Sequence, residues 1–304
     1  MNARNTHRPV DVNIYKGKEV LRRHSKKTPN VIVFDLDETL GSYADLNIMW
    51  ENLKNNILFN DLVDLYPEFT RYGILSILDF IYQKKISGIC DKIFIYTNNK
   101  CSYDFVELIS KYFSYKLGIA DNNLFDQIIR AFKVGNKIVE VSRTTQEKTH
   151  TDFIRCTLLP PKTQMCFIDN SYFPEMENKR IYYIQPLSYR HDLTKDEIIN
   201  RLKKENQCKP SKIYSTVDEK FLNRLYDKLY AFPRGIFEKH REYFETKHEI
   251  NKLVSQKIMY HIKDFFYLTQ PRKKTRRANY LSSRYTRKVK QLRSPIVSPR
   301  NISV

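Results

Sequence analysis

The chain has 304 residues and a formal net charge of +19, from 53 Lys and Arg against 34 Asp and Glu. Its seven glycines lie too far apart for any two-glycine phosphate loop, which excludes the GxGxxG, GxxxxGKS/T and GxSxG motifs. The seven histidines form no HExxH motif and the five cysteines no CxxC motif, which excludes a zinc-protease helix, a zinc ribbon and a thioredoxin-type site. Scattered cysteines in odd number suit a reducing compartment.

The positive charge is concentrated at the two ends of the chain. Residues 271–304 carry 11 basic and no acidic residues, and residues 1–30 carry eight basic and two acidic ones. We therefore expect a basic N-terminal arm over residues 1–29 and a disordered basic tail over 271–304, both suited to an acidic partner: nucleic acid, an acidic protein or an import receptor. The short basic pattern that fits import or nucleic-acid contact consists of Lys273, Lys274, Arg276 and Arg277.

Four short runs of apolar residues predict strands of a parallel sheet. They are continuously apolar rather than alternating, as expected where helices cover both faces of a sheet. The runs are Val31–Phe34, Ile93–Tyr96, Met165–Ile168 and Ile181–Ile184. Helical apolar spacing lies between them, for example at Phe105, Ile109 and Phe113. Strands separated by helices indicate an α/β domain with a mostly parallel sheet, which we place at residues 30–192.

Beyond residue 192 the pattern is helical only. Thr194–Glu197 and Thr216–Glu219 have the sequence of capping boxes and predict two helix starts. No Gly or Pro occurs from Ile236 to Gln270, which predicts one long helix or two. We expect residues 193–270 to form a helical extension that follows the α/β domain.

Polar residues follow three of the predicted strands directly. The carboxyl ends of parallel strands meet at one edge of the sheet, where ligands bind in open α/β folds, so we expect these side chains to converge on one crevice. They are Asp35 and Asp37 after the first strand, Thr97, Asn98 and Asn99 after the second, and Asp169, Asn170 and Ser171 after the third.

Phosphoryl transfer is the chemistry that fits this set. Asp35 would attack phosphorus and form an aspartyl-phosphate, and Asp37 would protonate the leaving oxygen and later take a proton from water. Thr97 offers a hydroxyl and a nearby amide to a phosphoryl oxygen. The alternative is that Asp37 and Thr39 are ordinary turn residues after a strand.

A phosphate bound among carboxylates needs positive charge. Asp35 and Asp169 suit a hard cation such as Mg²⁺. We choose Lys148 as the basic residue of the site, because Thr149–Asp152 resembles a helix start that leads towards the strand ending at Asp169. Lys133 is the rival, and a solvated surface lysine is the alternative for Lys148. His150 is expected to lie on the surface.

The motifs FDLDETL, IYTN and FIDNS, with a lysine between the second and third, resemble the haloacid dehalogenase (HAD) superfamily. The DLDETL and DNS pairing is similar to the branch of RNA polymerase C-terminal-domain phosphatases and NLI-interacting-factor-like phosphatases. The segment at 143–149 resembles versions encoded by large DNA viruses. The resemblance covers about residues 30–190 and implies a HAD-like three-layer α/β/α fold.

The resemblance also implies roles for the site residues. It implies a magnesium-dependent phosphatase with Asp35 as nucleophile and Asp37 as acid and base. The phosphate would be bound by Thr97, Asn98 and Lys148. The magnesium ligands would be Asp35, the Asp37 carbonyl, and Asp169 or Asn170.

This sequence departs from the family pattern at two places. Tyr172 stands where the family has a proline after DNS, and Lys148 precedes Asp169 by 21 residues, farther than the family spacing. Arg71, before a predicted helix, is either a contact for a phosphopeptide or a partner in a surface salt bridge.

The leading function is a phosphatase acting on phosphoserine or phosphothreonine of a protein. The alternatives are a phosphatase of nucleic-acid ends and a non-catalytic structural or virion protein with nucleic-acid-binding arms. Neither a signal peptide nor a run of transmembrane length occurs, so we expect an intracellular protein without membrane contact, in the cytoplasm or nucleus. If the protein is viral, that cell is the host cell, and the virion is a further location.

Overall fold

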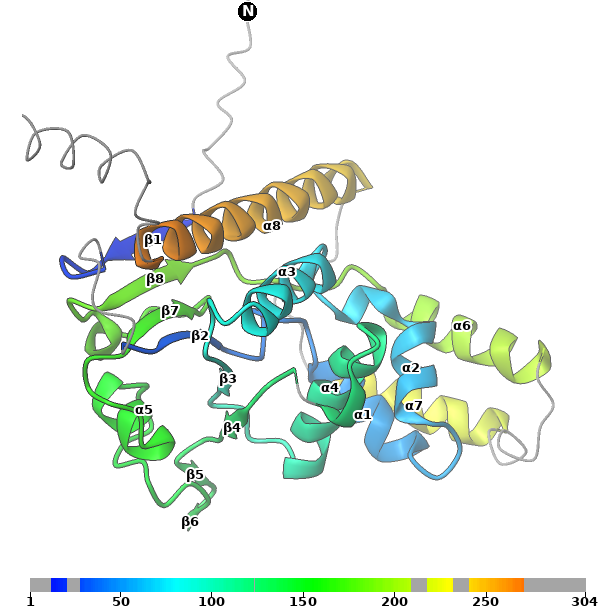
Figure 1. Cartoon of the computed structure of the whole chain (residues 1–304). Coiled ribbons are helices and arrows are strands. Elements are labelled where there is room, and N and C mark those ends of the chain that lie inside the picture. Colours follow the sequence, from blue (N-terminus) through cyan, green and yellow to red (C-terminus); the bar gives the residue numbers. More distant parts are fainter. Residues whose placement is uncertain (1–11, 21–27, 123, 209–217, 232–240, 271–304) are drawn as a thin grey trace, which may run out of the picture. The chain divides into compact units, whose positions relative to one another are not determined.

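The computed structural model describes residues 12–20, 28–122, 124–208, 218–231 and 241–270. The described residues from 12 to 270 belong to one compact unit. Its centre is a six-stranded sheet in the order β1-β8-β7-β2-β3-β4, in which β1 is antiparallel to β8 and the other pairs are parallel (Figure 1). The strands are β1 (Asn13–Lys16), β2 (Asn30–Phe34), β3 (Lys92–Tyr96), β4 (Gln127–Ile129), β7 (Gln164–Ile168) and β8 (Ile181–Gln185). The prediction of an α/β fold with a mostly parallel sheet is confirmed, as are the four predicted strands.

Helices cover both faces of this sheet. In β2, Ile32 and Phe34 pack into the core on one face, and Val31 and Val33 into the core on the other. Both faces of the strand are therefore excluded from solvent, which explains the run of apolar residues Val31–Phe34. The helices are α1 (Ala44–Leu53), α2 (Phe59–Leu65), α3 (Ile74–Ile86), α4 (Tyr103–Lys116), α5 (His150–Thr157), α6 (Lys195–Cys208), α7 (Glu219–Ala231) and α8 (Arg241–Thr269). This arrangement is compatible with a three-layer α/β/α fold.

The structure differs from the predicted domain division at both ends. Strand β1, inside the expected N-terminal arm, pairs with β8, with Tyr15 opposite Tyr183. At the other end, α8 packs against β7, β8 and α3, and its buried Val254, Ile258 and Ile262 belong to the same core as the sheet. The helices expected as an extension thus share one hydrophobic core with the sheet.

Several short elements were not predicted from the sequence. Strand β4 and the hairpin strands β5 (Lys133–Val134) and β6 (Lys137–Ile138) have two or three residues each, too few to produce a periodic pattern. Three single-turn 3₁₀ helices, at Pro67–Phe69, Ala120–Asn122 and Pro174–Met176, were also not predicted.

Two of the predicted helix starts are confirmed. The Thr149 hydroxyl accepts a hydrogen bond from the Asp152 amide at 3.0 Å and caps α5. At Thr194 the hydroxyl accepts from the Glu197 amide at 3.1 Å and the Thr194 amide donates to the Glu197 carboxylate at 2.7 Å, which completes a capping box.

Helix α7 begins at Glu219, the last residue of the second predicted capping box. Thr216 lies outside the described residues, and the carboxylate of Asp218 accepts from the Phe221 amide at 2.7 Å at the start of α7. Residues 241–269 form the single helix α8. The predicted basic tail, including Lys273, Lys274, Arg276 and Arg277, also lies outside the described residues. None of the helices in the described ranges has the length and apolar character needed to cross a membrane.

Candidate active site

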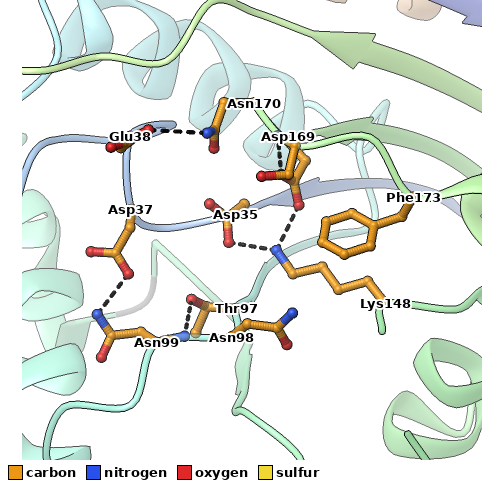
Figure 2. Close-up of a pocket in the computed structure, with 11 residues that line it drawn as sticks. Asp35, Asp37, Glu38, Thr97, Asn98, Asn99, Lys148, Asp169, Asn170 and Phe173 are labelled. Carbon is orange, nitrogen blue, oxygen red and sulfur yellow. Dashed lines mark hydrogen bonds and ion pairs between the residues drawn. The ribbon is translucent and has the colours of Figure 1, made fainter. Parts of the chain in front are cut away.

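A cavity of about 300 Å³ opens at the carboxyl ends of β2, β3 and β7 (Figure 2). It lies where the sequence analysis expected a ligand crevice. All seven site residues predicted within the described part of the chain line it. The lining residues are Asp35, Asp37, Glu38, Thr97, Asn98, Asn99, Lys148, Asp169, Asn170, Ser171 and Phe173.

Lys148 is buried in this cavity between two carboxylates. Its Nζ lies 2.5 Å from Oδ1 of Asp35 and 2.6 Å from Oδ2 of Asp169, and only 1% of the residue is exposed. The alternative of a solvated surface lysine is therefore wrong. Its rival Lys133 lies in the β5–β6 hairpin, is exposed and does not line the cavity. The structure thus brings Lys148 to the site despite its unusual spacing from Asp169.

The two carboxylates and the ammonium control one another's ionisation. Burial alone would lower the pKa of Lys148, but the Asp169 and Asp35 carboxylates outweigh it and raise that pKa, so the ammonium stays charged. Burial, together with the negative charge of Asp35, raises the pKa of Asp169 to about 7. Because two carboxylates share one ammonium, the three-residue cluster carries excess negative charge when both are ionised.

Asp37 lies apart from this cluster and has a partner of its own. Its Oδ2 accepts a hydrogen bond of 2.6 Å from Nδ2 of Asn99. Burial, and next the charge of Asp35, raise the pKa of Asp37 to about 6. This value keeps a substantial fraction of the carboxyl protonated just below neutral pH, as a general acid requires. Asn99 belongs to the polar end expected after β3, but its contact with Asp37 was not predicted.

The loop after β3 presents Thr97 and Asn98 to the cavity. Thr97 is buried, and its Oγ1 accepts a hydrogen bond from the Asn99 amide at 3.0 Å, which leaves the hydroxyl proton available to a ligand oxygen. Among the described residues, the buried Oδ1 of Asn98 has no hydrogen-bond partner. Both residues stand where the resemblance implies phosphate binding.

The turn after β2 that carries Asp37 has an unusual backbone. Glu38 has a φ of 58°, in the left-handed region that non-glycine residues seldom adopt, and its amide donates to the Gly41 carbonyl at 2.6 Å. A Cβ at Gly41 would lie 2.4 Å from the Phe69 carbonyl oxygen, so only glycine fits there. This strain requires support from the surrounding structure.

Arg71 supplies that support. It is 2% exposed, and its guanidinium donates to the carbonyls of Thr39 at 2.5 Å, Glu38 at 2.5 Å and Leu187 at 2.8 Å. Both predictions for Arg71, a phosphopeptide contact and a surface salt bridge, are therefore wrong. Burial lowers the pKa of Arg71 to about 10, which leaves it charged at neutral pH.

Thr39 joins the turn after β2 to the loop after β7. Its hydroxyl donates to Oδ1 of Asn170 at 2.9 Å and accepts from the Asn170 amide at 3.0 Å. Thr39 is thus more than a turn residue. Asp169 is the stronger of the two candidate metal ligands, because its carboxylate can carry a negative charge and the Asn170 amide cannot.

A second buried arginine holds the loop of Lys148. Arg143 donates to the carbonyls of Thr97 at 3.2 Å, Gln146 at 3.0 Å and Glu147 at 3.1 Å, and its guanidinium stacks on Tyr96 at 4.8 Å. It thereby connects the end of β3 with the residues just before Lys148. Arg143 belongs to the segment 143–149 that carries part of the family resemblance, but its buried supporting role was not predicted.

His150 is half-buried rather than a surface residue. Its Nδ1 lies 3.5 Å from Nδ2 of Asn178, and burial lowers its pKa. It does not line the cavity.

The donor set at the cavity fits Mg²⁺. The described residues contain no group of three or more His, Cys, Asp and Glu side chains that could hold a metal ion. However, Asp35 and Asp169 both reach a single cationic nitrogen, so one cation can contact both. The available donors are carboxylate and carbonyl oxygens, which hard cations prefer, and the excess negative charge favours a cation.

Comparison with known proteins identified no relative of this chain. No protein-family model, no curated protein and no solved structure matches the chain.

Proposed function

We propose that the protein is a magnesium-dependent phosphatase of the HAD type, which works through an aspartyl-phosphate on Asp35 and acts on phosphoserine or phosphothreonine of a protein. One observation carries the proposal: the buried Lys148 contacts both Asp35 and Asp169, at the ends of two adjacent parallel strands. Asp37 lies two residues beyond Asp35 with a raised pKa. A nucleophile, a cation and a separate acid within one cavity suit phosphoryl transfer.

In the first step, a carboxylate oxygen of Asp35 attacks phosphorus and the bond from phosphorus to the ester oxygen breaks. Asp37 donates its proton to that leaving oxygen. In the second step, water attacks the phosphorus of the aspartyl-phosphate, Asp37 takes a proton from this water, and the bond to Asp35 breaks. Lys148 offsets the negative charge on the phosphoryl oxygens, and the Thr97 hydroxyl donates a hydrogen bond that orients the phosphoryl group.

Asp35, Asp169 and the main-chain carbonyl of Asp37 are the groups that would hold Mg²⁺, which when bound supplies positive charge to the phosphate oxygens. We expect removal of divalent cations by a chelator to abolish phosphatase activity, and excess Mg²⁺ to restore it. Saturating Mg²⁺ is also expected to stabilise the folded protein by about 2–3 kcal/mol at a hundredfold excess over Kd, as a thermal shift would show. Undiminished hydrolysis in chelator would contradict the metal requirement.

The experiment that tests the proposal is one assay series with three substrates. Purified protein is incubated with p-nitrophenyl phosphate, with phosphoserine and phosphothreonine peptides, and with oligonucleotides phosphorylated at one end. We expect turnover of the first two and much lower kcat/KM for the oligonucleotides. A higher kcat/KM for the oligonucleotides would show that the substrates are nucleic-acid ends rather than phosphoproteins. If no substrate releases phosphate, the proposed phosphatase activity is refuted.

Replacing Asp37 with asparagine separates the two chemical steps. p-Nitrophenolate leaves without a proton, so Asp37→Asn is expected to release about one equivalent of it per enzyme in a burst and then turn over slowly, because the second step lacks its base. With a phosphoserine peptide, whose alkoxide needs a proton, no burst is expected. Rapid-quench measurements on both substrates test this, and equal bursts would show that Asp37 is not the acid.

A further inference from the structure

A group of aromatic side chains lies beside the cavity and has no part in the proposed chemistry. Tyr172 is 43% exposed, and its ring centroid lies 5.1 Å from that of Tyr15 and 6.2 Å from that of Tyr183. The rings of Tyr172 and Tyr183 are within 12° of parallel. We call Tyr15, Tyr172, Phe173 and Tyr183 the aromatic shelf.

The shelf begins at the wall of the cavity. Tyr172 stands between Ser171 and Phe173, which both line the cavity. Figure 2 shows Phe173 beside the Lys148 side chain, and the Lys148 nitrogen lies 5.2 Å from the Phe173 ring centroid. Tyr172 therefore belongs to the loop that forms this wall, and its exposed ring is available to groups that flank a phosphate bound at Lys148.

Hydrogen bonds hold the shelf in place. The Tyr183 hydroxyl donates to the Ser171 carbonyl and accepts from the Phe173 amide at 3.2 Å, and the Tyr172 hydroxyl donates to Glu177. This surface is thus preformed, so little conformational entropy would be lost when a ligand packs on it.

Strand β1 contributes to the same framework. The Tyr15 hydroxyl donates to Oε1 of Gln185 at 3.3 Å, and Nε2 of Gln185 donates to the carbonyl of Asn170 at 3.2 Å. Tyr15 is therefore linked through one side chain to a residue of the cavity.

The charges around the cavity favour a ligand with a single phosphate. Four carboxyl groups line it, from Asp35, Asp37, Glu38 and Asp169, and Lys148 is the one basic residue of this lining. The Glu38 carboxylate is also paired with the Arg190 guanidinium at 2.9 Å, so three acidic groups share the Lys148 ammonium. The Tyr172 hydroxyl contacts a further carboxylate, that of Glu177. A nucleic-acid strand carries a phosphate at every nucleotide and would be repelled at this edge, whereas a phosphopeptide with uncharged flanks would not.

We propose that the aromatic shelf binds an aromatic side chain of a phosphopeptide, close in sequence to the phosphoserine or phosphothreonine whose phosphate enters the cavity. This inference rests on the proposed function. Tyr172 is its central residue: its exposed ring provides the contact, and stacked or edge-on aromatic pairs add affinity beyond the area they bury.

The test is a positional scan of phosphopeptides. Tyr is placed singly at each of three positions before and after a phosphoserine in a Gly/Ser background. We expect one or two placements to lower KM by about tenfold with wild-type protein, and Tyr172→Ala to remove this preference. Hydrolysis of O-phosphoserine itself should be unchanged in Tyr172→Ala. Tyr172→Phe, which keeps the ring, should retain the preference, as should Tyr115→Ala, which removes an exposed tyrosine of α4.

Binding is measured separately, so that the inference and the proposed function can fail independently. Fluorescence anisotropy with the same peptides carrying a non-hydrolysable phosphonate gives Kd without turnover. Suppose that the wild-type protein binds the Tyr-containing peptides more tightly, that Tyr172→Ala removes this preference, and that no substrate is hydrolysed. This result would support aromatic binding at the shelf and refute the proposed phosphatase activity. If wild type and Tyr172→Ala show the same preference for Tyr-containing peptides, or if wild type shows none, the inference that the shelf binds an aromatic side chain is wrong. If Tyr172→Ala weakens the binding of phosphorylated oligonucleotides but not of the peptides, Tyr172 stacks on bases and the inference is wrong.

Discussion

Asp35→Asn is expected to reduce phosphatase turnover by at least about a thousandfold, because an amide oxygen does not form the covalent phosphoenzyme. The substitution keeps the shape of the side chain at the end of β2. It also removes one of the two carboxylates that share Lys148, so the folded state loses a repulsion as well as an ion pair. Steady-state kinetics with p-nitrophenyl phosphate and a phosphoserine peptide measure the effect.

The matched control is Asp79→Asn, which changes an exposed carboxylate on α3 and should leave turnover unchanged. Thermal unfolding of Asp35→Asn should match wild type within about 1 kcal/mol, which separates loss of chemistry from loss of fold. Wild-type turnover in a folded Asp35→Asn protein would rule out Asp35 as the nucleophile. Loss of turnover together with loss of folding would point to a structural role instead.

The parallel strands could be predicted because burial on both faces leaves a direct trace in the sequence. Strands β2, β3, β7 and β8 each contain four consecutive apolar residues, and a polar residue directly follows each of the first three strands. The carboxyl ends of parallel strands lie at one edge of a sheet, so it could be predicted that Asp35, Thr97 and Asp169 lie close together. Strand β1 left no such trace, since its four residues form an antiparallel edge and are only partly buried.

The supporting residues were harder to predict, since their partners are backbone atoms of distant loops. Arg71 and Arg143 are buried and donate to carbonyls, and nothing in a local sequence distinguishes such an arginine from an exposed one. Asn99 contacts Asp37 across 62 positions of chain. Lys148 was identified through the helix start at Thr149, a local signal, and its burial between two carboxylates emerged only from the fold.

Lys148→Met is expected to destabilise the protein by about 3–5 kcal/mol when divalent cations are absent, because it leaves the buried Asp35 and Asp169 carboxylates without their cation. Methionine keeps most of the side-chain volume, so the loss reports charge rather than packing. Adding Asp169→Asn to this variant removes one unpaired carboxylate and should recover part of the loss. Urea unfolding of the single and double variants in chelator measures both effects.

The control for this series is Lys133→Met, which removes the exposed rival lysine and should change stability by less than about 0.5 kcal/mol. Turnover should fall by at least about a hundredfold in Lys148→Met and stay at the wild-type level in Lys133→Met, since Lys148 lines the cavity and Lys133 does not. Recovery of stability by Asp169→Asn without recovery of turnover would show that Lys148 serves both the fold and the phosphate. If Lys148→Met and Lys133→Met unfold at the same urea concentration, the Asp35–Lys148–Asp169 cluster does not exist in solution as described.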